Sequence, residues 1–120
     1  MLIDMRNSLI LLFLWCSLTI SGATYYVSPG GSDSNPGTIS QPFFTLNKAW
    51  SQVSAGDVIY MRGGTYKYTT RQSLTSKDGT SGNLINVLAY PNESPVLDFT
   101  SSSDYFGVFL RASDLSLIHI

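Results

Sequence analysis

Carboxylates are the side chains of this sequence with the clearest capacity for chemistry, because such oxygen groups bind calcium and serve as general bases. Asp33 and Asn35 lie in the run GSDSNPG, whose spacing faintly resembles a calcium loop. Asp57 begins a predicted strand, and Asp98 ends another. One carboxylate does not make a calcium site, and Asp and Asn commonly bond backbone groups in turns, often two residues on. We therefore interpret all four as partners of turn or loop amides.

Two cations and two aromatic residues lie close together just past the middle of the chain. Lys67 and Arg71 could bind an acidic sugar, but we favour a solvated strand face, since exposed cations are the default. Tyr66 and Tyr68 share one face of a predicted strand, because successive side chains alternate. They could stack on sugar rings or pack in a core, and their chemistry fits both.

The triplet Asn92-Glu93-Ser94 matches the acceptor pattern for N-linked glycans. Pro95 follows it directly and disfavours its use. We therefore assign the triplet to a turn between two strands.

Thiol and imidazole chemistry depends on one residue each, Cys16 and His119. Cys16 lies in the first 23 residues, which are typical of a secretion signal. It would therefore be removed together with that signal. His119 lies in the last six residues, Leu115-Ser116-Leu117-Ile118-His119-Ile120. LSLIHI is the translation of CTG TCT CTT ATA CAC ATC, which resembles a transposon adapter from sequencing libraries. We hypothesise that residues 115–120 are a non-native tail. The alternative is an ordinary strand, which alternating Leu and Ile also suit. The nucleotide sequence decides, because other codons for these six residues would disprove the hypothesis.

The amino-terminal segment has the order of features that a secretion signal requires. Arg6 precedes an apolar run from Leu9 to Ile20, and small residues lead to a predicted cut between Ala23 and Thr24. The run is shorter than the ~20 residues that span a bilayer, so we expect no stable membrane anchor. The protein is expected to be secreted, and its mature part has no thiol for a disulfide.

Composition agrees with a secreted all-β protein. Only 12% of the 120 residues are charged, the net charge is -1, and Tyr, Phe, Ser, Thr and Gly are plentiful. No basic patch or stripe is present, so we expect no nucleic-acid partner. Aromatic and hydroxyl residues favour strands over helices.

One short helix is expected to interrupt the strands. Leu46, Ala49, Trp50 and Val53 recur at helical spacing and share one apolar face. Thr45 is a suitable amino-terminal cap, and we assign the carboxyl-terminal stop to Gly56. So short a helix is not stable alone, so we expect this face to cover the open end of a sheet structure as a structural cap.

Short strands separated by turn residues account for most of the rest. A tight turn at Gly63-Gly64 is expected between two of them, and residues 69–75 are not assigned. If each coil of a solenoid takes about 20–25 residues, Val87 and Phe109 stand one coil apart. The predicted strands cover Tyr25–Ser28, Asp57–Arg62, Thr65–Tyr68, Leu84–Tyr90, Val96–Phe99 and Tyr105–Arg111.

The runs TYYVSPGGSDSNPGT, QPFFTLNKAW, GDVIYMRGGTY and SGNLINVLAYPNESPVLDF together resemble the amino-terminal part of secreted right-handed parallel β-helix proteins. They are most similar to polysaccharide lyase family nine, the pectate lyase-like branch. The resemblance implies an all-β, right-handed parallel β-helix, of which residues 24–114 supply the amino-terminal cap and first coils. It also implies a lysine base and a calcium ion held by aspartates. No position here matches those motifs, so we assign no catalytic or metal residue.

The resemblance therefore implies the amino-terminal part of a monomeric, secreted lyase that cleaves a uronic-acid polymer of pectate type by calcium-assisted β-elimination. Its partner would be an acidic polysaccharide, and calcium would bind the full-length protein outside this fragment. This fragment alone is expected to be inactive. Alternatives are a lyase for alginate or a glycosaminoglycan on the same scaffold, and a non-catalytic β-helix that acts as an adhesin or binds carbohydrate.

Overall fold

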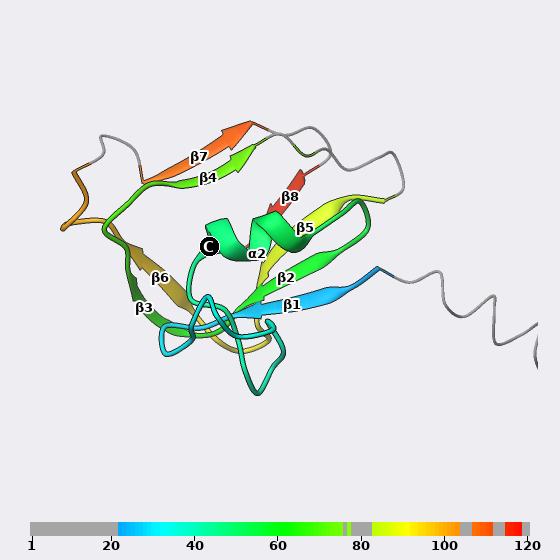
Figure 1. Ribbon diagram of the computed structural model, residues 1–120, viewed down its shortest axis with the longest axis horizontal. Helices are drawn as coiled ribbons and strands as arrows, with labels where there is room; N and C mark the ends of the chain where they lie inside the picture. The colour runs from blue at the N-terminus through cyan, green and yellow to red at the C-terminus, as the bar shows by residue number, and fades with distance from the viewer. Residues whose placement is uncertain (1–21, 76, 78–82, 104–106, 112–114, 119–120) are drawn as a thin grey trace, which may run out of the picture.

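The computed structural model describes residues 22–75, 77, 83–103, 107–111 and 115–118. Short strands dominate this part of the chain, with one α-helix among them (Figure 1). The predicted signal residues 1–21, with Cys16, and the tail residue His119 lie outside the described residues. The elements are β1 (Thr24–Val27), α2 (Leu46–Gln52), β2 (Val58–Met61), β3 (Gly64–Lys67), β4 (Gln72–Thr75), β5 (Ile85–Ala89), β6 (Pro95–Asp98), β7 (Val108–Arg111) and β8 (Leu115–Ile118).

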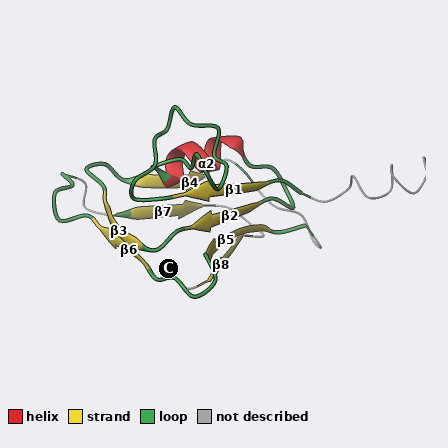
Figure 2. Cartoon of the chain, turned by 90° about the horizontal axis from the view of Figure 1, so that it is seen from below, coloured by secondary structure: helices red, strands yellow, loops and turns green. Residues whose placement is uncertain are grey.

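The strands form three parallel sheets that the chain visits in turn. The first sheet has the order β1-β2-β5-β8, the second pairs β3 with β6, and the third pairs β4 with β7. All five strand pairings are parallel. The chain therefore winds in coils, and each sheet takes one strand per coil, as the views in Figures 1 and 2 show. This is the architecture of a parallel β-helix, as the sequence predicts.

The coils are longer than the sequence prediction of 20–25 residues. Ile59 pairs with Val87, 28 residues further on, and Gln72 pairs with Val108, 36 residues further on. The predicted match of Val87 with Phe109 is wrong, because Phe109 lies in β7 opposite Ser73 of the third sheet. The turns between strands differ in length, so apolar spacing along the sequence does not measure the coil.

The turn at Gly63-Gly64 is a corner between two sheets. β2 pairs with β1 and β5, whereas β3 pairs with β6, so the strands on either side of the turn do not pair with each other. Gly64 has a φ of 113°, a backbone conformation that favours glycine. The glycines therefore let the chain change direction sharply from the first sheet to the second.

The core lies inside the coils. It is filled by every second side chain along the strands, since successive side chains point to opposite faces. Tyr66 and Tyr68 of the second sheet are 0% and 2% exposed. The Tyr66 hydroxyl lies 2.9 Å from the carbonyl oxygen of Val27, and the Tyr68 hydroxyl donates to that of Phe44 at 2.9 Å. Burial raises the pKa of both phenols. Of the two interpretations left open by the sequence, packing in the core is the correct one.

Helix α2 begins after the threonine that the sequence predicts as its cap, and its apolar face is buried. The Oγ1 atom of Thr45 accepts a hydrogen bond from the backbone N–H of Lys48 at 3.1 Å, which caps the first turn. The four predicted apolar side chains are all buried, and Figure 2 shows the helix beside β1 and β4, at the opposite end of the stack from β5 and β8. The buried residues are Leu46, Ala49, Trp50 and Val53.

The carboxyl-terminal end of α2 differs from the prediction. The helix ends at Gln52, and Val53 is already extended with a ψ of 155°. Gly56 has a φ of 88°, but it serves the turn before β2, in which the N–H of Asp57 donates to the carbonyl of Ser54. Gly56 was a correct turn residue assigned to the wrong element.

Strand β4 falls in the segment that the sequence leaves unassigned, because its residues are mostly polar. Gln72 is nevertheless only 1% exposed. Its Oε1 atom accepts the N–H of Asn47 at 3.0 Å, and its Nε2 atom donates to the carbonyl of Thr70 at 3.1 Å. Internal hydrogen bonds thus replace the water that a glutamine usually needs.

Residues Leu115–Ile118 form strand β8 and pair with β5. Alternating Leu and Ile support such a strand whatever the origin of the residues, so the hypothesis of a non-native tail stays a prediction. No helix in the described residues is long and apolar enough to cross a membrane.

Candidate functional site

The carboxylates singled out from the sequence accept hydrogen bonds from backbone amides. The partners of Asp33 lie further along the chain than expected. The Oδ1 atom of Asp33 accepts the N–H groups of Phe44 and Thr45 at 2.9 and 2.8 Å, and its Oδ2 atom accepts the Thr45 hydroxyl at 2.7 Å. Asn35 donates to the carbonyl of Pro42 at 2.9 Å. These bonds join the loop to the start of α2, whereas the sequence suggests bonds two residues away.

Asp57 and Asp98 accept bonds from nearby turn amides, as expected, and Asp57 also reaches the residue before β1. Asp57 is 7% exposed and accepts the N–H groups of Ala23 at 2.7 Å and Ser54 at 2.8 Å. Asp98 accepts the N–H of Thr100 at 2.9 Å, and bonding to Thr100 lowers the pKa of this carboxyl. Both carboxylates therefore stabilise turns.

Calcium does not fit the residues that the structure describes. Within residues 22–75, 77, 83–103, 107–111 and 115–118, no three His, Cys, Asp or Glu side chains gather closely enough to hold a metal ion. Calcium needs several oxygen ligands at once, and Asp33, Asp57 and Asp98 already accept amide protons.

The two predicted sugar-binding cations lie on the surface. Lys67 is exposed on β3 and stands in register with Asp98 of β6. Its positive charge adds a smaller contribution to the lowered pKa of Asp98. Arg71 is also exposed, just before β4. These positions agree with a solvated strand face.

Three tyrosines missed by the sequence analysis form a cluster on the first sheet. Tyr26 and Tyr60 are paired in register on β1 and β2, with ring centroids 5.9 Å apart. Tyr90 follows β5 and adds its ring 5.8 Å from that of Tyr60 and 6.3 Å from that of Tyr26. All three are half-buried. We call Tyr26, Tyr60 and Tyr90 the tyrosine cluster.

An arginine and a glutamate border the tyrosine cluster. The guanidinium carbon of Arg62 lies 4.3 Å from the centre of the Tyr90 ring. Its Nε and Nη2 atoms donate to the two carboxylate oxygens of Glu93 at 2.8 and 2.9 Å. The N–H of Gly63 donates to the same carboxylate at 2.9 Å. Bonding to Arg62 and then to Gly63 lowers the pKa of Glu93 to about 2, so the pair is charged at neutral pH.

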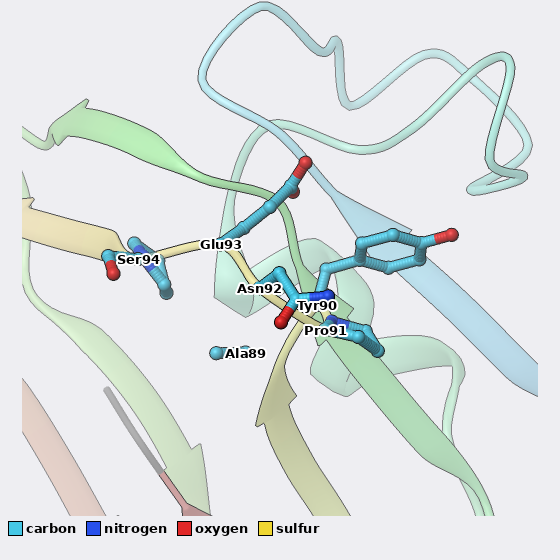
Figure 3. A pocket seen from close by; sticks show the side chains of 7 residues that line it. Ala89, Tyr90, Pro91, Asn92, Glu93 and Ser94 are labelled. Carbon is cyan, nitrogen blue, oxygen red and sulfur yellow. The ribbon is translucent and has the colours of Figure 1, made fainter.

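A pocket of about 440 Å³ adjoins this group. Residues 89–95 line it, in the turn that joins β5 to β6, and Figure 3 shows the Tyr90 ring and the Glu93 side chain extending from that turn. Asn92 at the turn has a φ of 63°, the one positive φ outside glycine among the described residues. Such strained positions recur at functional sites.

The coil length explains why the sequence analysis missed the tyrosine cluster. Tyr26, Tyr60 and Tyr90 come together only when β1, β2 and β5 are aligned at their true spacing. A repeat search at 28–36 residues would have stacked Tyr26 on Tyr60 and placed Tyr90 nearby. The spacing of these tyrosines therefore carries the signal, at a period longer than the predicted coil of about 20–25 residues.

The predicted cleavage point lies at the start of the first strand. Thr24 begins β1, and Ala23 both donates to Asp57 and accepts the N–H of Val58 at 2.9 Å. The backbone of Gly22 packs so closely against the carbonyl of Gly56 that a Cβ atom would collide with it. The last residues before the predicted cut are therefore part of the folded first coil in this chain.

Comparison with known proteins adds the family context. Residues 25–120 match the family model described as "Pel9A-like, right handed beta helix region". Pectate lyase L of Paenibacillus polymyxa (strain SC2) is 42% identical over 101 residues, which cover 83% of this chain and 22% of the relative. The chain spans about a fifth of the length of three curated relatives and 6% of a fourth.

Two solved structures share the fold. A structure described as a rhamnogalacturonan lyase has a TM-score of 0.73 and 34% identity, over 82% of this chain and 28% of that one. The crystal structure of pectate lyase Pel9A has a TM-score of 0.66 and 26% identity, over 82% of this chain and 27% of that one. With the three parallel sheets, these matches confirm the predicted right-handed parallel β-helix.

Proposed function

The chain belongs to the Pel9A-like right-handed β-helix family, and from that premise we propose that the protein containing it is a polysaccharide lyase of pectate type. The observation that carries the proposal is the 42% identity to a pectate lyase over 83% of this chain. The parallel coils of the structure agree with the fold of that family. The substrate would be an acidic polysaccharide built from uronic acids.

The proposed reaction is a β-elimination. A base removes the proton next to the uronate carboxylate, the bond from the sugar ring to the glycosidic oxygen breaks, and that oxygen leaves with a proton. The product carries a new carbon–carbon double bond, and no oxidant or reductant is needed. No position of this sequence matches the lysine base that the family resemblance implies, so the proposal assigns no catalytic residue here.

Calcium is proposed for the whole protein only. Its chemical contribution would be to neutralise the substrate carboxylate while negative charge develops beside it. The described residues do not fit such an ion, so the proposal places the ligands elsewhere in the protein. We further propose that the protein is monomeric and is secreted by means of residues 1–23.

The proposal gives helix α2 a structural role at one end of the β-helix. The buried face of Leu46, Ala49, Trp50 and Val53 covers the core at the β1 and β4 side of the stack. An open coil exposes apolar side chains and unpaired edges, which favour aggregation. We propose that α2 caps this end of the β-helix.

A second candidate has a specific observation in its favour. The rhamnogalacturonan lyase structure is more similar to this chain than the Pel9A structure, in TM-score and in identity. A lyase for rhamnogalacturonan would use the same scaffold on a backbone that contains another sugar besides the uronate.

The decisive experiment is an absorbance assay for unsaturated uronate on the complete gene product. Polygalacturonate and rhamnogalacturonan would be offered separately, each with calcium and with a chelator. Calcium-dependent absorbance on polygalacturonate alone is the expected result. Absorbance only on rhamnogalacturonan would support the second candidate, and none on either substrate would overturn both.

A further inference from the structure

We propose that the tyrosine cluster, together with Arg62, is a binding subsite for a stretch of acidic polysaccharide. The choice of an acidic polymer rests on the proposed function, whereas the site itself rests on the structure. The ligand class is a chain of uronate sugars, which offer hydroxyl groups and a carboxylate on each residue.

The first argument is the position of the cluster. Tyr60 lies between Ile59 and Met61, whose side chains are completely buried in the core. Successive side chains of a strand point to opposite faces, so Tyr60 and its partner Tyr26 lie on the outer face of the sheet. Both are half-buried by ring contacts with each other and with Tyr90. The outer surface of the coil therefore carries a continuous aromatic area.

The second argument is that the three tyrosine hydroxyls of this area have no hydrogen-bond partner within the described structure. No hydroxyl of the tyrosine cluster forms a hydrogen bond with any described residue. The core tyrosines Tyr66 and Tyr68 differ, since their hydroxyls bond carbonyl oxygens. Phenylalanine would give the same ring packing, so the outer hydroxyls are available for a polar ligand.

The third argument concerns Arg62. Its bridge to Glu93 uses Nε and Nη2, so the Nη1 donors have no partner among the described residues. The bridge and the Tyr90 ring hold the guanidinium in place, about a third exposed. A guanidinium fixed in this way has little freedom to lose when it binds a carboxylate. This group selects an acidic sugar over a neutral one.

The pocket supplies room for the ligand next to these groups. It is lined by residues 89–95, which include Tyr90 of the cluster and Glu93 of the ion pair. Its volume of about 440 Å³ falls in the range of small-molecule sites, about 300–1,000 Å³. The strained backbone of Asn92 forms part of its wall. The pocket thus shares Tyr90 with the tyrosine cluster and Glu93 with the ion pair.

The test measures binding without turnover. The complete gene product is run in native gels that contain polygalacturonate and a calcium chelator, and its retardation gives an apparent Kd. The test variant is Tyr26→Phe/Tyr60→Phe/Tyr90→Phe, which keeps the rings and removes only the hydroxyls. The control variants are Lys67→Ala and Val96→Ala, which change exposed side chains of the second sheet.

We expect the test variant to bind polygalacturonate about tenfold more weakly or worse, because several ligand hydrogen bonds are lost. Its urea midpoint should equal that of the native protein, since the hydroxyls have no bonds within the described structure. The controls should bind normally. Unchanged binding by the test variant would overturn the proposal, as would an equal loss in the controls.

Two further probes test the acidic character of the ligand. Fully methyl-esterified pectin keeps the sugar chain but has no charged carboxylate, and dextran is neutral throughout. We expect clearly weaker retardation by both than by polygalacturonate. Equal retardation by all three would overturn an acidic specificity.

The outcomes separate this inference from the proposed function. Loss of binding in the test variant without any lyase activity would support the subsite and refute the lyase. Lyase activity with an unchanged KM for long polymers in the test variant would support the lyase and refute the subsite. If both hold, the test variant should show a raised KM for long polymers and an unchanged kcat.

Discussion

Glu93 shows how one side chain can join two coils. Its carboxylate accepts Arg62 and Gly63, which follow β2, while Glu93 itself follows β5. The ion pair and the amide bond therefore link successive turns on the outside of the β-helix. Hydrogen bonds to an ionised group are stronger than neutral ones, so this contact stabilises the corner as long as Glu93 stays charged.

The lowered pKa of Glu93 predicts a pH-dependent stability. The folded pKa is about 2, below the ordinary value of 4.5, so the contribution is fully present above about pH 5. It is lost as the pH falls from about 4.5 towards about 2, because over this range the unfolded state takes up a proton that the folded state still excludes. We expect the urea midpoint of the native protein to fall over this range, and that of Glu93→Gln to fall less. Parallel midpoint curves would contradict this assignment.

At the residue scale, the sequence predicted the type of partner better than its position. Asp57 and Asp98 bond nearby turn amides as expected, but Asp57 also accepts the N–H of Ala23, 34 residues earlier in the chain. Asp33 bonds residues 11 and 12 positions ahead, which depends on how the long loop folds back. Whether Tyr66 packs in the core or is exposed depends on the position of the first sheet, where its hydroxyl meets Val27, and the alternation of one strand does not give that position.

Among the elements, α2 carries the largest single buried side chain of the proposed cap. Trp50 is 4% exposed, and its indole N–H donates to the carbonyl of Thr75 in β4 at 2.9 Å. The helix also contacts β1. One residue thus connects the helix to the third sheet through both packing and a hydrogen bond.

Removing this contact should destabilise the whole chain. We expect Trp50→Ala to lower the free energy of unfolding by about 3–5 kcal/mol, because a large buried ring leaves a cavity. Trp50→Phe should lower the free energy of unfolding by less, since it keeps a buried ring. Its remaining loss comes from the smaller ring and the missing bond to Thr75. Gln52→Ala, an exposed change on the same helix, is the matched control and should be nearly neutral. Urea unfolding followed by circular dichroism measures all three, and a native midpoint for Trp50→Ala would refute the proposed cap.

The helix and the strong strands were predictable because their signals are local. Helical spacing and a threonine cap predicted α2, and runs of strand-forming residues between turn signals predicted β2 and β5. β4 was missed because the burial of Gln72 depends on Asn47, 25 residues earlier in the chain. The tyrosine cluster was missed for a similar reason, since it depends on which strands lie side by side.

At the scale of the whole molecule, the family match covers most of this chain but only about a fifth of its curated relatives. Parallel coils each rest on their neighbours, so stability grows as coils are added. The first sheet already has strands from successive coils in the order β1-β2-β5-β8. The activity proposed above belongs to the complete gene product.

Secretion gives a prediction at this scale. We expect the protein recovered from the medium of a secreting host to begin at Thr24, because Ser21 and Ala23, the third and first residues before the cut, are small residues that a signal peptidase accepts. N-terminal sequencing of the recovered protein is the measurement. Ala23→Trp should block the cut and keep the protein with the cells. Secreted protein that begins at Met1 would contradict the assignment.

The hydrogen bonds of Ala23 have a consequence for the order of events during maturation. A peptidase must hold the residues around Ala23 in its own active site, yet those residues bond Asp57 and Val58 when the first coil is folded. If the cut falls after Ala23, cleavage and the closing of the first rung compete for the same backbone. After such a cut the bonds of Ala23 to Asp57 and Val58 are lost with the leader, and the new α-ammonium group of Thr24 lies one residue from the former partner of Asp57. A first coil that folded before export would therefore hold the residue at the cut and shield the peptide bond after Ala23 from the peptidase.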